Sequence, residues 1–320
     1  MQKNNIKKLS EITHHDIAEV GYKAAYLGDL KRMNFDVPDG FIITKSFFHE
    51  YLKQTNIAPE INTELYRLNY EDLNSLRKVY ELISTLILQT EFPHELEDEI
   101  LSAYNKLDSN FTSVRSSATA EHLDTASWDF ELPSFLNINE AGLIDIIKKC
   151  WARLFHPRCL TLRCQGNLKD CPVSMAIFVQ KMVAANKSGL YFSQNPVNEN
   201  PHQAALEIIY GLPDIQHQLN LHPDTYIIDK FTKELIDINI HPQDTMLKKS
   251  WGSIKAEKIK LNQQFSQKAS NAELKKILSQ CMKIEKKYEK PIVLEWALDK
   301  DGLHFLQINK LISSVNTANQ

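Results

Sequence analysis

A segment rich in hydroxyl groups, Val114–Trp128, contains one arginine and is the part of the chain best suited to bind phosphate. Arg115 follows apolar and β-branched residues that are typical of a strand. Three hydroxyl side chains come after it, those of Ser116, Ser117 and Thr119. A guanidinium donates two parallel hydrogen bonds and stays charged at any working pH, so at a strand end it can hold phosphate oxygens together with hydroxyls and backbone amides. An arginine paired with an acidic neighbour is the alternative, and it would be preferred if the segment stood alone.

A second cationic side chain, Lys23, is expected in the first turn of a helix. The segment Val20–Thr44 has the pattern of an amphipathic helix initiated by Gly21, then a turn around Pro38, then a strand. A structural lysine is poorly placed at the positive end of a helix dipole. A lysine that faces an anion bound by the free N–H groups of the same turn is better placed.

The third segment, Ile292–Lys310, is predicted to be a β-hairpin with a three-residue loop, Lys300–Gly302, whose glycine takes a positive φ. Counting back from this loop places Glu295 directly opposite Gln307. Because side chains alternate along a strand, Asn309 lies on the same face, and the leucines, isoleucine and tryptophan of the hairpin fill the other. A carboxylate beside a carboxamide offers the few oxygen ligands that magnesium needs when substrate phosphates supply the rest. A cross-strand pair at the surface is the alternative if the hairpin stands alone.

Periodicity predicts an α+β protein whose helices come mainly in the first half. Helical patterns are found in five regions: Ser46–Gln54, Leu73–Gln89, His94–Leu107, Asn139–Cys164 and Asn271–Tyr288. Strand patterns dominate from Met175 onward. We therefore expect an N-terminal lobe over residues 1–172, a C-terminal lobe over 173–312 and a mobile tail over 313–320.

Composition restricts the kinds of function. The chain has 320 residues, of which 43% are hydrophobic, so it is long enough for two lobes with sizeable cores. Its formal net charge is −3 and it has no sustained basic run, which argues against nucleic-acid binding. No apolar stretch reaches membrane-spanning length, and the N-terminus lacks the apolar core of a signal peptide. We expect a cytoplasmic protein that does not bind a membrane.

Together, these three segments resemble the ATP-binding domain of the family that includes phosphoenolpyruvate synthase, pyruvate phosphate dikinase and rifampin phosphotransferase. Ser174–Pro196 is similar to the strand of that family that joins its lobes, with the hairpin after it. Glu207–Asp214 and Pro223–Tyr226 are similar to the turn and strand that follow. The resemblance runs from Val20 to Asn309 and implies an ATP-grasp-type fold, in which two α+β lobes close on ATP.

The resemblance also implies roles for individual residues. Lys23 and Arg115 would hold the phosphates of ATP and act as the catalytic cations, and Ser134 would lie near them. Gln180, with the backbone around Met182 and Val183, would contact the adenine. Magnesium would bind Glu295 and Gln307, a pair that the hairpin register places together independently. The site residues so predicted are Lys23, Arg115, Ser134, Gln180, Met182, Val183, Glu295 and Gln307.

Two departures from the family pattern bear on the reaction. Phe130 stands where the family has a glycine that lets the backbone approach the phosphates. Asn309 stands where the family has an arginine that contacts phosphate, and Lys310 next to it is expected to point to the opposite face. The family continues into a domain with a phosphorylatable histidine, and no histidine of this chain has the corresponding setting.

Three functions follow as hypotheses. The first is an ATP- and magnesium-dependent enzyme that transfers a phosphoryl or adenylyl group to a small-molecule acceptor or to a histidine on a separate chain. The second is a nucleotide-binding module with little catalysis that regulates a partner protein. The third is an unrelated interaction protein. The retained Lys23, Arg115, Glu295 and Gln307 favour the first, and Phe130 and Asn309 favour the second.

Overall fold

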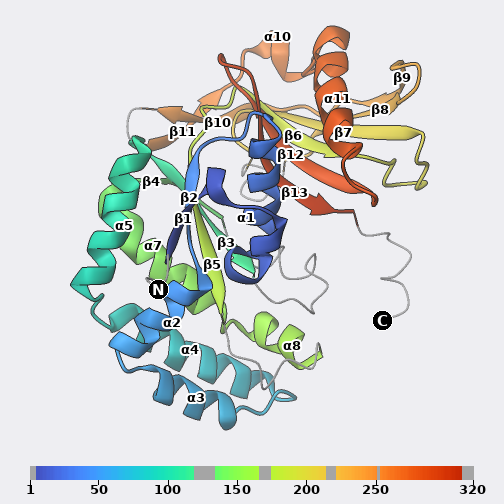
Figure 1. Cartoon of the computed structure of the whole chain (residues 1–320). Helices are drawn as coiled ribbons and strands as arrows, with labels where there is room; N and C mark the ends of the chain where they lie inside the picture. Colours follow the sequence, from blue (N-terminus) through green and yellow to red (C-terminus); the bar gives the residue numbers. More distant parts are fainter. Residues whose placement is uncertain (1–4, 119–133, 166–173, 214–220, 251–252, 312–320) are drawn as a thin grey trace. The chain divides into compact units, whose positions relative to one another are not determined.

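The chain is described here from a computed structural model (Figure 1). The structure describes residues 5–118, 134–165, 174–213, 221–250 and 253–311. The predictions for Thr119, Phe130 and the tail over 313–320 lie outside these residues. The chain divides into two units, the first formed by Met1–Arg32 and Asp39–Met182, and the second by Met33–Pro38 and Val183–Gln320.

The first unit contains a five-stranded sheet with the order β1-β2-β5-β3-β4. Each neighbouring pair in this sheet is antiparallel. Its strands are β1 (Ile6–Lys8), β2 (Gly40–Ile43), β3 (Thr112–Ala118), β4 (Ser134–Ile138) and β5 (Met175–Lys181). Since β5 pairs with both β2 and β3, it belongs to the first unit, whereas we expected the boundary before it at residues 172/173.

Helices pack on both faces of this sheet (Figure 1). The described helices are α1 (Ile17–Arg32), α2 (Lys45–Gln54), α3 (Ala58–Tyr66), α4 (Leu73–Gln89), α5 (His94–Leu107), α7 (Glu140–Arg153) and α8 (Pro157–Gln165), with short 3-10 turns at Leu9–Glu11 and His14–Asp16. Tyr51 and Phe48 of α2 stack against Trp151 of α7 at ring distances of 4.8 and 5.0 Å. Val114 and Val179 of the sheet belong to the same buried core.

The opposite face of the sheet receives α1. The Ala24 amide of α1 donates to the Ser117 hydroxyl of β3 over 3.5 Å. Gly21 has φ 74° and ψ 167°, which is not helical, so the regular helix begins after it. Lys23 therefore lies in the first turn of a glycine-initiated helix, as predicted. Glycine suits this position because side chains rarely tolerate a positive φ.

The second unit contains a six-stranded sheet with the order β13-β12-β6-β7-β8-β9. Its strands are β6 (Lys187–Phe192), β7 (Gln203–Tyr210), β8 (Asp224–Asp229), β9 (Leu235–Asn239), β12 (Ile292–Leu298) and β13 (Leu303–Lys310). A separate hairpin, β10 (Thr245–Ser250) with β11 (Ser253–Lys258), leads to the short α10 (Leu261–Gln264).

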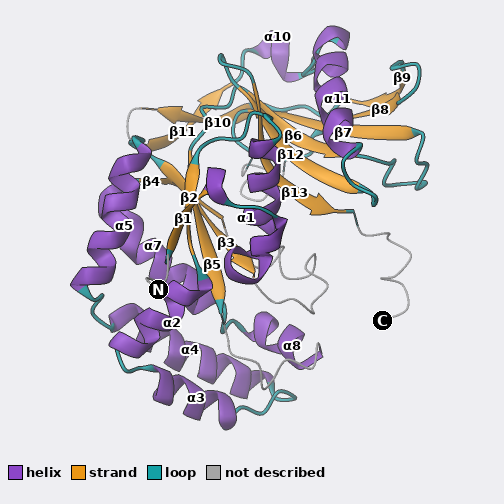
Figure 2. Ribbon diagram, in the orientation of Figure 1, coloured by secondary structure: helices purple, strands orange, loops and turns teal. Residues whose placement is uncertain are grey.

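Helix α11 (Asn271–Glu285) covers one face of the second sheet (Figure 2). Lys187 of β6 pairs with Glu273 over 2.6 Å, and the buried Tyr191 donates to Glu285. Strand alternation then directs the residues between them, such as Leu190, to the opposite face. Glu295, which pairs with Leu190 and with Gln307, lies on that opposite face. In the part of the chain that the structure describes, no helix has the length and apolar composition needed to cross a membrane.

A histidine clamp joins the segment Met33–Pro38 to the hairpin β12–β13 within the second unit. His304 contacts Asp36 at 3.1 Å through Nδ1 and Asp299 at 2.9 Å through Nε2. Burial alone would lower the pKa of His304, but the two carboxylates outweigh it and raise the pKa above its ordinary 6.5. The folded protein thus favours the imidazolium form.

This clamp predicts a pH-dependent stability. A raised pKa means that the stabilisation is fully present below the unfolded value of about 6.5 and is lost as the pH rises through the folded value. The contribution should be on the order of 1 kcal/mol, because Asp36 is largely exposed to solvent. Thermal unfolding of the wild type and of His304→Gln is measured between about pH 5.5 and 8.5, an interval that spans the unfolded pKa of histidine. The difference between the two unfolding temperatures should become smaller as the pH rises. A difference in unfolding temperature that stays the same at every pH would contradict the stabilising role of the two His304 ion pairs.

Candidate nucleotide site

The first sheet brings together three of the predicted site residues. Arg115 of β3 pairs with Ser134 of β4 on one side and with Phe178 of β5 on the other. Gln180 lies two residues along β5 from Phe178, so it points to the same face. Arg115, Ser134 and Gln180 consequently share one face of one sheet, opposite the face that carries Val114.

Helix α1 packs on this same face. Ser117, which accepts the Ala24 amide, lies two residues after Arg115 and so shares its face. Lys23 is next to Ala24 in the first turn of the helix and is buried, as is Arg115, with 4% and 5% exposure. Arg115 and a row of hydroxyls therefore lie on one face of the sheet, and Lys23 belongs to the first turn of the helix packed on that face, which is a chemical environment suited to an anion.

The predicted adenine contact falls at the end of β5. The two units divide between Met182 and Val183. The Met182 amide donates to the Phe111 carbonyl over 3.3 Å, and the Asn137 amide lies 3.1 Å from the Met182 sulfur. Because the Met182 N–H is used within the first unit, a base bound here would depend on neighbouring backbone groups.

The hairpin of the second unit places Glu295 opposite Gln307, which confirms the predicted register at this pair. The predicted loop was wrong. Leu298 pairs with Leu303, so the connection is residues 299–302, one residue longer than expected, and a bulge between Glu295 and Trp296 restores the register. Gly302 has a positive φ of 150°, as predicted.

This longer connection is stabilised by a side chain that strand alternation alone could not reveal. The Asp299 carboxylate accepts the amides of Asp301 and Gly302 at 2.8 and 3.0 Å. Aspartate commonly stabilises a turn in this way by bonding the backbone two residues on. The signal in the sequence was the Asp-Lys-Asp-Gly run beginning at Asp299.

Glu295, Gln307 and Asn309 lie on the same face of the second sheet. The Gln307 amide nitrogen donates to the Asn309 side-chain oxygen over 3.1 Å. In this orientation the Gln307 oxygen is the atom directed away from Asn309. A glutamate carboxylate and a glutamine oxygen are hard oxygen donors of the type magnesium prefers, so the donor set fits that ion.

One acidic residue on this face was not predicted as part of the site. Leu190 of β6 pairs with Glu295 of β12 on one side and with Glu207 of β7 on the other. Glu207 is therefore in line with Glu295 and Gln307, two strands away. Burial raises the pKa of its carboxyl group. Finding it from sequence would have required the pairing of β6 with both β7 and β12.

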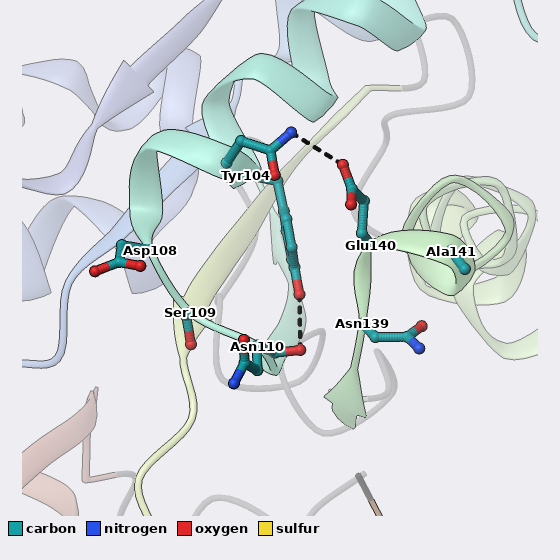
Figure 3. Close-up of a pocket in the computed structure, with 8 residues that line it drawn as sticks. Tyr104, Asp108, Ser109, Asn110, Asn139, Glu140 and Ala141 are labelled. Atoms are coloured by element: carbon teal, nitrogen blue, oxygen red, sulfur yellow. Dashed lines mark hydrogen bonds between the residues drawn. The ribbon is translucent and has the colours of Figure 1, made fainter.

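A separate pocket of about 410 Å³ lies in the first unit at the end of α5 and the start of α7 (Figure 3). Tyr104 donates to the Asn110 carbonyl over 3.1 Å, and Asn105 donates to Glu140 over 3.0 Å. Its lining is polar and contains none of the predicted site residues.

The sequence matches the family described as pyruvate phosphate dikinase, AMP/ATP-binding domain, over residues 17–318. The chain belongs to this family. Its α+β structure in two units is accordingly an ATP-grasp-type fold, as the resemblance implied. The members of this pyruvate phosphate dikinase family to which it is similar are much longer than the chain.

Two relatives illustrate the match. The probable phosphoenolpyruvate synthase of Methanocaldococcus jannaschii is 34% identical over 307 residues, which is 93% of this chain and 26% of that protein. The probable phosphoenolpyruvate synthase of Archaeoglobus fulgidus is 33% identical over 305 residues, 93% of this chain and 40% of its own length. The chain thus spans about a quarter to two fifths of these relatives.

Among solved structures, D-alanyl-alanine synthetase A from Vibrio cholerae aligns with 69% of this chain and 48% of its own, at 10% identity and a TM-score of 0.29. That score is too low to bear on the fold. The family assignment therefore depends on the sequence matches.

Proposed function

We propose that the chain binds ATP with magnesium and serves a phosphotransfer reaction of the phosphoenolpyruvate synthase type. The observation that carries this proposal is the cross-strand pair of Glu295 and Gln307 on one sheet face. The position of Arg115 beside Ser134 on one face of the other sheet, with Lys23 in the helix packed on that face, supports it. Membership in an AMP/ATP-binding domain family is consistent with both.

Each group has a distinct role in this proposal. Glu295 and Gln307 would hold magnesium through one oxygen each, and the bound ion would neutralise charge on the phosphates. Arg115 would donate to phosphate oxygens through its guanidinium fork, and Lys23 would add a positive charge near the helix N-terminus. Ser134 and Gln180 would contribute polar contacts next to Arg115. Phosphoryl transfer relies mainly on positioning and charge stabilisation of this kind.

The acceptor is proposed by class only. Transfer would break the bond between a phosphorus of ATP and its bridging oxygen, and would form a bond from that phosphorus to an acceptor atom with a lone pair. A small molecule or a histidine on a separate chain would supply that atom. Fold similarity does not identify an acceptor.

Product analysis tests this proposal. Purified protein is incubated with Mg-ATP carrying a label in the adenine and another in the terminal phosphate, and ADP, AMP, phosphate and pyrophosphate are separated. Release of phosphate or pyrophosphate that disappears in Glu295→Gln supports a phosphotransfer site. Binding of Mg-ATP without any release, even with candidate acceptors added, would point to the second function.

That second function is a nucleotide-binding module that regulates a partner protein. Asn309 favours it, since this position has an arginine in the family pattern and here accepts a hydrogen bond from Gln307. A neutral carboxamide cannot supply the positive charge with which an arginine would stabilise the negative charge that develops on a phosphate during transfer.

Substituting Asn309→Arg discriminates between these functions. The new guanidinium would lie on the face of Gln307, two residues along the strand, and should raise Mg-ATP affinity by roughly tenfold or more. ATP turnover should rise with it. Isothermal titration and the product assay measure the two effects, and Lys310→Arg, at the exposed end of β13 on the opposite face, is the matched control. Substantial turnover in the wild type that Asn309→Arg abolishes would show that Asn309 serves a different reaction.

A further inference from the structure

The pairing of Glu295 with Gln307 depends on a β-bulge in β13. From the turn, β12 and β13 pair regularly as far as Trp296 and Phe305. The next pair is Glu295 with Gln307, so Leu306 is the extra residue of the bulge. Without it, Leu306 would stand opposite Glu295 and Gln307 would turn to the other face, because a shift of one residue reverses the direction of the side chains. The proposed magnesium pair therefore exists only while the bulge is held in place.

The segment Met33–Pro38 holds β13 immediately before this bulge. The Phe305 amide donates to the Asp36 carbonyl over 2.8 Å. The Phe35 ring meets the Phe305 ring edge-on at a centroid distance of 6.0 Å. Since β13 is at the end of the sheet order, β12 is its one strand partner within the described residues. The segment covers the other edge of β13 at the residue where the bulge begins.

His304 adds a charged contact at the same place. Its Nδ1 lies 3.1 Å from Asp36 and its Nε2 lies 2.9 Å from Asp299. The side chains of His304 and Asp299 are largely buried. The ring thus ties the turn, the strand and the segment together. His304 also pairs with Ala297, two residues along β12 from Glu295, so it lies on the face that carries the proposed magnesium pair.

Both contacts of the ring require the imidazolium form, because a neutral imidazole has one N–H and can donate to only one of the two carboxylates. Within the described residues, the carboxylates of Asp36 and Asp299 face the ring, and its cross-strand partner Ala297 is uncharged. The turn adds only solvent-exposed charges, those of Lys300 and Asp301. The clamp is therefore complete at low pH and loses one contact when the ring is deprotonated.

We propose that His304 is a positioning residue for the Glu295–Gln307 pair: held between Asp299 and Asp36, it fixes β13 next to the bulge and so maintains the register that brings the two magnesium ligands together. The inference rests on the proposed function, because it takes this pair to bind the magnesium of Mg-ATP.

Isothermal titration of the whole chain with ATP, in excess magnesium and in chelator, tests this role. The ratio of the two affinities measures the advantage that magnesium gives. His304→Ala should lower this ratio roughly tenfold, as expected for the loss of charge-assisted contacts, and leave the affinity in chelator close to that of the wild type. Asp36→Asn removes one charge but keeps the backbone carbonyl that accepts Phe305, so its loss should be smaller. His202→Ala, at an exposed position of the same unit, should match the wild type.

The pH dependence of the same ratio distinguishes positioning from a general loss of stability. Burial alone would lower the pKa of His304, but the two carboxylates raise it above the ordinary 6.5. The contribution of the clamp is therefore fully present below about pH 6.5 and is lost as the pH rises through the folded value. The magnesium advantage of the wild type should exceed that of His304→Gln at low pH and approach it at high pH. Both proteins bind the same nucleotide, so the ionisation of ATP itself affects them alike.

Hydrogen exchange of the Phe305 amide measures the clamp without nucleotide. Because the Asp36 carbonyl accepts this N–H, the amide should exchange faster in His304→Ala than in the wild type or in His202→Ala. Unchanged exchange would overturn the inference. Faster exchange with an unchanged magnesium advantage, or equal losses of affinity with and without magnesium, would also overturn it and leave the ATP site standing. A wild type that binds no ATP, or binds it without a magnesium advantage, would overturn the proposed metal site and the inference with it.

Discussion

Replacing Arg115 by alanine should weaken Mg-ATP binding by about 1.5–3 kcal/mol and leave adenosine binding nearly unchanged, because we propose that the guanidinium contacts phosphate and not the base. Arg115 is buried on the same face as Ser134 and Gln180, where a lost cation is not replaced by solvent. Isothermal titration with the two ligands measures the difference directly.

Two control variants make this result interpretable. Arg67→Ala removes an exposed arginine of the first unit and should leave both affinities unchanged. Arg115→Lys keeps the charge and loses the planar fork, so it should fall between wild type and Arg115→Ala. Equal losses for ATP and adenosine would assign Arg115 a structural role, which was the alternative weighed for an isolated arginine among hydroxyls.

Replacing Glu295 by glutamine should abolish most of the advantage that magnesium gives to ATP binding. The change keeps the shape of the side chain and removes the negative charge that we propose holds the ion beside Gln307. The expected loss is on the order of 2 kcal/mol in the presence of magnesium, with a small gain in chelator because phosphate repulsion is relieved.

Glu289→Gln is the matched control for this variant, since it removes an exposed carboxylate of the same unit. Thermal unfolding without ligand should place both variants close to the wild type. A Glu295→Gln protein that retains full magnesium dependence would assign the metal to other ligands.

The helices whose bounds could be predicted from sequence were those in which apolar residues recur at helical spacing over a long, uninterrupted stretch. The expected helices at 73–89 and 94–107 coincide with α4 and α5. The expected helix Asn139–Cys164 is instead two helices, α7 and α8, and the second begins at Pro157. Proline is favoured at the first position of a helix and disfavoured inside one, so it signalled the break.

The hairpin shows how a cross-strand pair can be predicted correctly through a wrong intermediate step. The alternation along each strand fixed which residues share a face, and this placed Glu295 with Gln307. The loop length was misjudged because Asp299 is part of the connection, where its carboxylate accepts backbone amides, and is not the last paired residue of the strand. A bulge then compensated by one residue, and neither feature changes the average alternation pattern.

Glu207 was missed for a different reason. Its strand, β7, lies in the region after Met175 where strand patterns were expected to dominate. Its relation to Glu295 depends on the pairing of β6 with both β7 and the distant β12, and the period of one strand carries no information about that register. The grouping of Arg115 with Ser134 and Gln180 similarly depends on β5 lying beside β3.

The measurement that tests the central claim most directly is the titration of the unmodified protein with ATP, once with excess magnesium and once in chelator. The grouped cations of the first unit and the Glu295–Gln307 pair of the second predict binding in both conditions, with clearly tighter binding when magnesium is present. Equal affinity in the two conditions would contradict the metal site. The absence of both heat and thermal stabilisation in either condition would contradict the account of this domain as a nucleotide-binding protein.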